Sequence, residues 1–128
     1  MLRVLIIDDS ISILALLQDT IAKAGYEAHT AKNAKEINES LNGNDFDLVI
    51  TDIYMPEQDG LETILNLRIT KPDIPIVAMS SNTGYSDVLD VAKKLGARKC
   101  LRKPFTQEAI LDSLLETIGP GAPSNSAN

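Results

Sequence analysis

The chain has 128 residues, of which 44% are hydrophobic and 23% are charged, a composition typical of a globular protein with a single core. The net charge of −6 argues against a nucleic-acid-binding protein, which would need a basic face to neutralise phosphates. Cys100 is the only cysteine and no stretch approaches the roughly 20 apolar residues that cross a bilayer, so we expect a cytoplasmic protein without a disulfide or a membrane segment.

Apolar runs of strand length alternate with amphipathic segments of helical length along the chain. In chain order we expect strands at 2–7, 27–30 (weak), 48–51, 76–79 and 99–102. The expected helices are 10–24, 34–41, 60–70, 85–95 and a last one from the N-cap Thr106 to Ile118. The residues expected to face the core from these helices include Leu14, Leu17, Ile21, Leu61, Ile64, Leu65, Val88, Val91, Ala92, Leu95, Ile110, Leu111, Leu114, Leu115 and Ile118.

Five strand–helix repeats predict an α/β fold, in which a parallel sheet is covered by helices on both faces and joined by right-handed crossovers. Residues 119–128 read Gly-Pro-Gly-Ala-Pro-Ser-Asn-Ser-Ala-Asn and offer no apolar side chain worth burying. We therefore expect one domain over residues 1–118, followed by a flexible C-terminal tail or the start of a linker.

Polar side chains follow four of the expected strands. Asp8-Asp9 follow the first strand, Asp52 the third, Ser80 the fourth and Lys103 the fifth. Because the carboxyl ends of parallel strands meet at one edge of the sheet, where α/β proteins bind ligands, these groups should lie together. Carboxylates, a hydroxyl and an ammonium at such an edge indicate phosphate and magnesium chemistry.

The three carboxylates would repel one another unless a cation lay among them, and Mg²⁺ suits such an oxygen-only site. Asp52 is then a candidate nucleophile that forms an aspartyl-phosphate. Lys103 and Ser80 would contact the phosphoryl oxygens. Taken singly, each residue has a plainer explanation: Asp9 could be a helix N-cap and Lys103 a solvated surface lysine. Pro104 suggests a rigid Lys-Pro bond, cis or trans, that aims the lysine.

These motifs together resemble the receiver domain of bacterial two-component response regulators, in particular its small single-domain, chemotaxis-regulator-like members. The matching residues are Asp8-Asp9, Asp52 with Met55-Pro56 and Asp59-Gly60, Ser80, and Lys103-Pro104-Phe105. The resemblance covers about residues 2–118. It implies a flavodoxin-like, doubly wound (βα)5 fold with five parallel strands in the order 2-1-3-4-5.

The resemblance also implies a role for each site residue. Asp52 would be the phosphoacceptor, and Asp9, Asp52 and the backbone carbonyl of Tyr54 would bind Mg²⁺ (or Mn²⁺), with Asp8 acting through water. Lys103 would pair with the phosphoryl group and Ser80 would be the switch hydroxyl. The donor would be a sensor histidine kinase or a histidine phosphotransfer protein. A downstream protein would read the face formed by helix four, strand five and helix five. Such a protein is not an enzyme in the usual sense, since it catalyses only its own phosphorylation and dephosphorylation.

Two departures from the family pattern affect the expected switch. Cys100 replaces the Tyr or Phe usually found three residues before the lysine, so either the output face is read differently or the coupling is weaker. Tyr54 and Asn82 occupy the positions that tune access of water to the acyl phosphate, and a bulky Tyr54 predicts a longer-lived phosphorylated state.

Three alternatives remain at this point. A degenerate receiver would act only as a scaffold. A flavodoxin-like FMN-binding protein would share the fold, and residues 81–84 (Ser-Asn-Thr-Gly) faintly resemble a phosphate loop. That loop should follow strand one, however, where Asp8-Asp9 would repel phosphate. An aspartate-dependent phosphohydrolase would need an acid two residues after the nucleophile, where Tyr54 stands.

Overall fold

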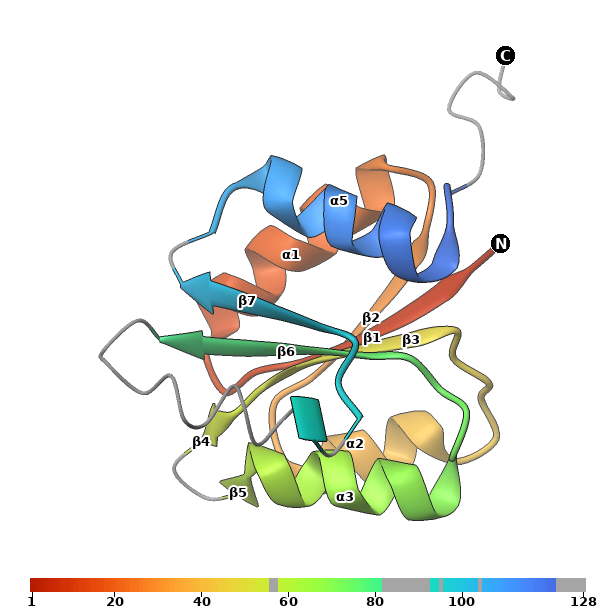
Figure 1. Cartoon of the computed structure of the whole chain (residues 1–128), viewed down its shortest axis with the longest axis vertical. Helices are drawn as coiled ribbons and strands as arrows, with labels where there is room; N and C mark the ends of the chain where they lie inside the picture. Colours follow the sequence, from red (N-terminus) through yellow and green to blue (C-terminus); the bar gives the residue numbers. More distant parts are fainter. Residues whose placement is uncertain (56–57, 82–92, 95, 104, 122–128) are drawn as a thin grey trace.

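A computed structural model of the chain describes residues 1–55, 58–81, 93–94, 96–103 and 105–121, and a parallel sheet lies at its centre (Figure 1). The elements in chain order are β1 (Arg3–Ile7), α1 (Ile11–Lys23), β2 (Glu27–Ala31), α2 (Ala34–Leu41), β3 (Leu48–Asp52), β4 (Tyr54–Met55), β5 (Gln58–Asp59), α3 (Gly60–Thr70), β6 (Ile76–Ser81), β7 (Lys99–Lys103) and α5 (Gln107–Ile118). The five long strands pair in parallel in the order β2-β1-β3-β6-β7. This confirms the predicted parallel sheet and its strand order.

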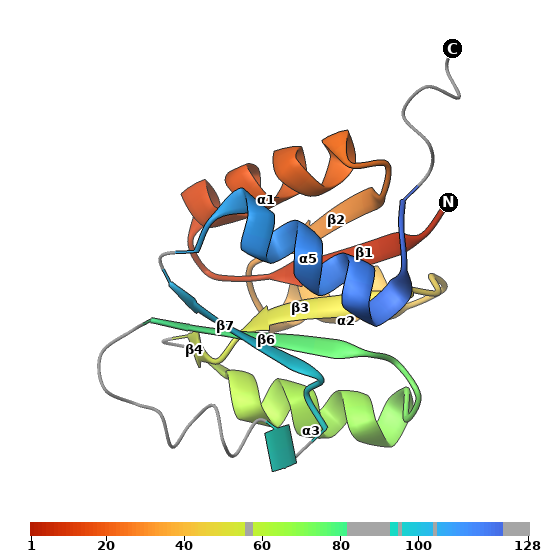
Figure 2. The ribbon, with the colours of Figure 1, turned by 45° about the horizontal axis from the view of Figure 1, so that its top comes forward.

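Helices cover both faces of the sheet. Helices α1 and α5 lie on one face, and α2 and α3 lie on the other (Figures 1 and 2). Alternate residues of β1 point to opposite sides, so Leu5 and Ile7 join the core under α2 and α3, whereas Val4 and Ile6 join the core under α1 and α5. Because the strand is buried on both faces, its sequence is a continuous apolar run rather than an alternating one.

Most of the residues expected to face the core are buried where they are described, Leu111 and Ile118 are partly buried against the core, and two residues are exposed. Leu65 is 47% exposed and Leu115 is 51% exposed, which corrects both predictions. On α3 the core-facing positions belong to Ile64 and Leu67, and on α5 Leu114 is fully buried. Successive residues on a helix point in different directions, and Leu65 and Leu115 lie on the solvent side of the buried stripe that ends at Ile64 and at Leu114.

Four strands run further than the sequence predicts. Strand β2 includes Ala31, β3 includes Asp52, β6 continues to Ser81, and β7 includes Lys103. Asp52, Ser80 and Lys103 therefore lie within the ends of the strands rather than in the loops after them. The antiparallel pair β4–β5 was not predicted. Most of the helix expected over 85–95 lies outside the described residues, although 93–94 are helical. Asn82 and Pro104 also lie outside them. None of the helices in the described ranges has the length and apolar character to span a membrane.

The N-cap of the first helix is Ser10 rather than Asp9. The Ser10 hydroxyl accepts a hydrogen bond from the Ile13 backbone N–H at 3.4 Å, as an N-cap does. The idea that Asp9 serves as the cap is therefore wrong. Thr106 caps α5 as predicted, accepting from the Ala109 N–H at 3.0 Å.

A buried tyrosine holds the chain that follows α5. The Tyr26 hydroxyl donates a hydrogen bond to the Gly119 carbonyl at 2.7 Å, and the Tyr26 side chain is only 4% exposed. A Cβ atom at Gly121 would lie 2.5 Å from the Ala24 carbonyl oxygen, so this part of the chain packs against the turn between α1 and β2. The division between residues 1–118 and a C-terminal tail stays a prediction, and residues 122–128 lie outside the described ones.

We expect Tyr26→Phe to loosen the end of α5 without unfolding the domain. Burial raises the pKa of Tyr26, so the phenol stays protonated and donates at neutral pH. Losing one such hydrogen bond costs about 1 kcal/mol, which predicts roughly fivefold faster amide exchange at Gly119, whose N–H is bonded to the Leu115 carbonyl. Exchange measured by NMR should be unchanged at Leu17, in the middle of α1. Equal rates at Gly119 in both proteins would show that the hydroxyl does not hold this segment.

Candidate functional site

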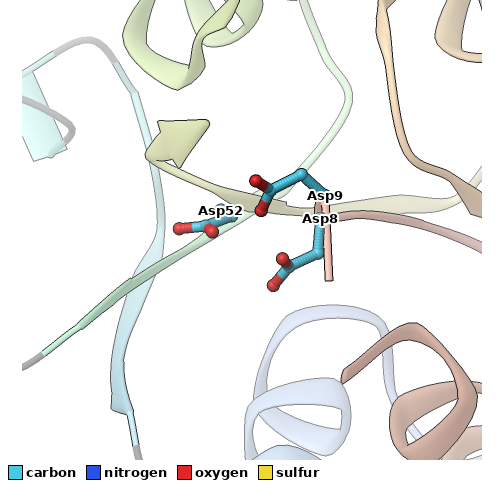
Figure 3. A group of neighbouring side chains, drawn as sticks. All are labelled: Asp8, Asp9 and Asp52. Carbon is cyan, nitrogen blue, oxygen red and sulfur yellow. The ribbon is translucent and has the colours of Figure 1, made fainter. Parts of the chain in front are cut away.

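Three carboxylates converge at the carboxyl ends of the central strands. Asp8 and Asp9 directly follow β1, and Asp52 ends β3 (Figure 3). One oxygen from each carboxylate lies within 4.8 Å of the other two. Asp8 and Asp52 are buried, with 0% and 4% of their surfaces exposed, whereas Asp9 is exposed.

The pairing of β1 with β3 brings these acids together. The two strands run in parallel, with Ile7 opposite Thr51, so the next residue of each strand, Asp8 and Asp52, stands at the same edge. All five residues of β3 are buried. Hydrophobic burial of this strand therefore fixes the position of Asp52, which is charged and would otherwise stay in water.

Lys103 joins two of the carboxylates. Its ammonium Nζ donates to Asp8 Oδ2 at 2.7 Å and to Asp52 Oδ2 at 3.2 Å. In the strand order β1-β3-β6-β7, the lysine side chain reaches past β6 to contact Asp52, and past β6 and β3 to contact Asp8. Burial alone would lower the pKa of Lys103, but the hydrogen bond to Asp8 and the charge of Asp52 outweigh it and raise the pKa. The lysine is therefore charged at neutral pH, and three carboxylates share one ammonium.

Asp8 is held in place by a contact that the sequence analysis did not identify. Its Oδ1 accepts a hydrogen bond from the Ser10 backbone N–H at 2.9 Å, while Oδ2 accepts from Lys103. An aspartate that bonds to the backbone two residues later forms an Asx-turn, for which Asp followed two residues later by Ser at a strand–helix junction is a recognisable signal. Asp8 is thereby oriented towards Asp52 from the backbone as well as from the lysine.

Ser80 lies on the strand between Asp52 and Lys103. Asp52 is opposite Met79 in the β3–β6 pair, and Ser81 is opposite Lys103 in the β6–β7 pair, so Ser80 stands at the same edge as both. It is buried, with 2% of its surface exposed. The sheet thus brings Asp8, Asp52, Ser80 and Lys103 to one edge, as the sequence predicts.

The remaining predicted positions are less fully described. Tyr54 begins β4, two residues after Asp52, and the ligand role of its carbonyl stays a prediction. Asn82 lies outside the described residues. Cys100 is half-buried on β7 and packs against the core under α2 and α3, with no disulfide. Its effect on switching also stays a prediction.

The chemistry of the site fits a divalent cation. Its candidate ligands are carboxylate oxygens only, and one lysine leaves two of the three negative charges unbalanced. Such hard oxygen donors favour Mg²⁺ or Mn²⁺ over softer metals. Asp9 and Asp52 could hold the ion directly, whereas both oxygens of Asp8 already accept hydrogen bonds, from the Ser10 N–H and from Lys103.

Comparisons with known proteins agree with this geometry. The family model described as "Response regulator receiver domain" matches residues 4–115. The chemotaxis protein CheY of Thermotoga maritima is 35% identical over 113 residues, which cover 88% of this chain and 93% of that protein. The structure of the chemotaxis protein CheY4 of Vibrio cholerae superposes with a TM-score of 0.84 at 32% identity, covering 92% of this chain and 99% of that one.

A second kind of relative is much longer. The DNA-binding transcriptional regulator NtrC of Rhizobium meliloti is 29% identical over 116 residues, which are 91% of this chain but only 23% of that protein. The chain thus spans about a quarter of this relative and nearly all of the CheY proteins. The receiver match favours the receiver over the flavodoxin-like FMN-binding alternative. The chain belongs to the family of response regulator receiver domains.

Proposed function

We propose that this receiver is phosphorylated on Asp52 by a phosphohistidine donor and thereby acts as a conformational switch for protein–protein output. The observation that carries the proposal is the buried Asp52 carboxylate, which is joined to Asp8 through the Lys103 ammonium and lies within 4.8 Å of Asp9. The donor would be a sensor histidine kinase or a histidine phosphotransfer protein, in the cytoplasm.

The reaction is a transfer of one phosphoryl group between two side chains. A carboxylate oxygen of Asp52 attacks the phosphorus, a P–O bond forms, and the P–N bond to the donor imidazole breaks. The imidazole keeps the electron pair of that bond and takes up a proton from water. Lys103 offers a positive charge to the phosphoryl oxygens, and an Mg²⁺ held by Asp9 and Asp52 would neutralise others when bound. In this proposal the receiver domain catalyses only its own phosphorylation and dephosphorylation.

The metal part of the proposal predicts a change in stability. Mg²⁺ binds only to the folded site, so it should raise the thermal midpoint in a concentration-dependent way. We expect Asp9→Asn to remove most of this rise, because it deletes an exposed ligand while leaving the buried Asp8 and Asp52 in place. Thermal unfolding followed by circular dichroism, in Mg²⁺ and in EDTA, measures the thermal midpoint of each protein. If Mg²⁺ raised the thermal midpoint of the Asp9→Asn variant as much as that of the wild type, Asp9 would not be a metal ligand.

The switch part involves Ser80, whose hydroxyl would be drawn towards the phosphoryl group. The loop after β6 would then move and alter the face made by the segment over 85–95, β7 and α5, which a downstream protein reads. Cys100 stands on β7 where family members carry an aromatic ring. A small thiol fills less volume than a ring in either state, so we infer that this face is read through changes other than an aromatic rotamer.

Tyr54 would control how long the phosphorylated state lasts. Standing two residues after Asp52, a bulky side chain screens the acyl phosphate from attacking water, with Asn82 as its counterpart across the site. We expect Tyr54→Ala to shorten the lifetime of the phosphorylated protein, measured by phosphate release after the donor is removed. Tyr54→Phe, which keeps the bulk, is the matched control. An unchanged rate in Tyr54→Ala would refute the screening role.

Intact-mass spectrometry tests the proposal directly. After incubation with acetyl phosphate and Mg²⁺, the wild-type protein should gain one phosphoryl mass, lose it on treatment with hydroxylamine as an acyl phosphate does, and gain none in EDTA. Beryllofluoride provides a second readout, because it should shift the amide NMR signals of the β3 and β7 ends even if the acyl phosphate is too short-lived to see. A protein that gives neither result is a scaffold receiver.

A further inference from the structure

The basic residues of this acidic protein are concentrated in one segment. Residues 93–103 read Lys-Lys-Leu-Gly-Ala-Arg-Lys-Cys-Leu-Arg-Lys and hold half of the 12 basic residues of the chain without a single acidic one. The rest of the chain carries the other six basic residues against all 18 acidic ones. Such segregation creates a local positive potential on a protein that is otherwise strongly negative.

Lys103 and Lys99 already have carboxylate partners, and Arg102 is engaged as well. Lys103 belongs to the acidic site, and the Lys99 ammonium lies 2.8 Å from a Glu116 carboxylate on α5. In contrast, Lys93, Lys94 and Arg98 are exposed, and within the described residues none of the three forms an ion pair with a carboxylate.

Arg68 adds a fourth positive charge beneath these three. Its guanidinium donates to the carbonyls of Pro72 and Ile74 at 2.6 Å and to that of Gly96 at 3.3 Å. All three acceptors are neutral, so the contacts fix the guanidinium without balancing its charge. Its Nε is buried without a hydrogen-bond partner among the described residues. Burial, together with the nearby charge of Arg98, lowers the pKa of Arg68, and the charge of the exposed Asp73 opposes this effect.

The same contacts make the surface rigid. Gly96 has a φ of 109°, a conformation that favours glycine, and a Cβ atom there would lie 2.7 Å from the Arg68 Nε, so glycine lets the turn lie close to the guanidinium. The Gly96 N–H bonds to the Lys93 carbonyl at 3.0 Å, and the Arg98 N–H bonds to the Ile76 carbonyl at 2.8 Å. The backbone that carries the exposed cations is therefore fixed before any ligand arrives, which lowers the entropy cost of binding.

The basic cluster, defined as Arg68, Lys93, Lys94 and Arg98, lies far from the acidic site. It stands at the amino end of β7, beside the carboxyl end of α3, whereas the acidic site is at the carboxyl end of the same strand (Figure 1). The four residue steps from Lys99 to Lys103 separate the two ends by about 13 Å. Binding at the cluster leaves Asp52 accessible.

We propose that the basic cluster is a docking site for a short acidic segment of a partner protein. A nucleic acid is disfavoured because a long polyanion would extend from the cluster over a surface with a large excess of acidic residues. A second copy of this chain is disfavoured because two molecules of net charge −6 repel each other. A short run of carboxylates matches both the size and the sign of the cluster. The proposal does not depend on phosphorylation of Asp52.

The test uses a fluorescein-labelled peptide rich in glutamate and serine, with binding followed by fluorescence polarisation. Lys93→Glu/Lys94→Glu should weaken binding by about tenfold at low ionic strength, and the effect should shrink at about 0.15 M salt. Lys32→Glu/Lys35→Glu is the matched control, since both residues are exposed near α2 and the variant has the same net charge. It should bind like wild type, as should Asp52→Asn. Amide NMR shifts should be confined to the turn around Gly96.

Several outcomes would overturn the proposal. These are the absence of peptide binding to wild type, equal losses in the two charge-reversal variants, and a single-stranded oligonucleotide that binds as tightly as the peptide. Self-association in sedimentation that Lys93→Glu/Lys94→Glu abolishes would assign the surface to a second copy instead. Circular dichroism checks the fold, and Lys93→Ser/Lys94→Ser replaces the reversal variant if that one does not fold.

Discussion

Asp52→Asn is expected to abolish phosphoryl uptake from acetyl phosphate and from a phosphohistidine donor. The amide that replaces the carboxylate is neutral and a much weaker nucleophile, while the shape of the side chain is kept. Asp52 is buried beside Lys103, and the other carboxylate at the lysine, Asp8, already accepts hydrogen bonds on both oxygens, from the Ser10 N–H and from Lys103. Intact-mass spectrometry in Mg²⁺ measures the loss.

Asp45→Asn is the matched control, because the Asp45 side chain is fully exposed and Asp45 precedes β3, whereas Asp52 ends that strand. It should accept one phosphoryl group as wild type does. A hydroxylamine-labile phosphoryl group on the Asp52→Asn protein would place the acceptor on another carboxylate and would refute the assignment.

Lys103→Ala is expected to impair both stability and chemistry. Without the ammonium, the buried Asp8 and Asp52 face each other and Asp9 with no positive charge nearby, and removing one partner of a buried pair costs about 3 kcal/mol. Mg²⁺ should restore part of this loss by occupying the carboxylates. Phosphorylation should slow by about 10²-fold or more, because a positive charge on the phosphoryl oxygens is missing. Urea unfolding and single-turnover phosphorylation measure the two effects.

The neighbouring Lys99 provides the control for this variant. Its pair with Glu116 is largely exposed, so Lys99→Ala should cost only about 0.5 kcal/mol. The pKa of Lys103 is raised in the folded state, so its contribution is complete below the ordinary lysine pKa of 10.5 and is lost as the pH rises through the folded value. The difference in stability between wild type and Lys103→Ala should therefore be constant near neutral pH and shrink in strong base. A stability equal to that of Lys99→Ala would mean that Lys103 does not neutralise the acids.

The parallel sheet and its acidic edge could be predicted because a strand buried on both faces must be continuously apolar. The run Val4–Ile7 can end only where a polar group is tolerated, and that place is the edge where Asp8 stands. The same reasoning located Asp52, Ser80 and Lys103. The sequence could not give the exact strand ends. Polar residues at the end of a strand still form backbone hydrogen bonds to the neighbouring strand, so the strand continues past its last apolar residue.

Other parts of the fold could not be predicted, because the sequence segments that form them are too short or too ambiguous to show a pattern. The β4–β5 pair has two residues on each side, too few for a periodic pattern. The assignment of Leu65 and Leu115 to the core was wrong because a leucine beside a core residue has the same chemistry as one within the core, and only the helix rotation separates them. Which carboxylate Lys103 prefers depends on the path of its side chain across β6 and cannot be read from spacing.

The contact between Lys103 and Asp8 joins residues that are 95 positions apart, and it spans the sheet from β1 to its edge strand β7. A ribosome releases the acids early and the lysine near the end of synthesis. An unfinished chain therefore has its nucleophile but not its cation. We expect that a nascent or nicked chain lacking β7 is a poor phosphoryl acceptor, so that competence to receive a signal reports the completion of folding.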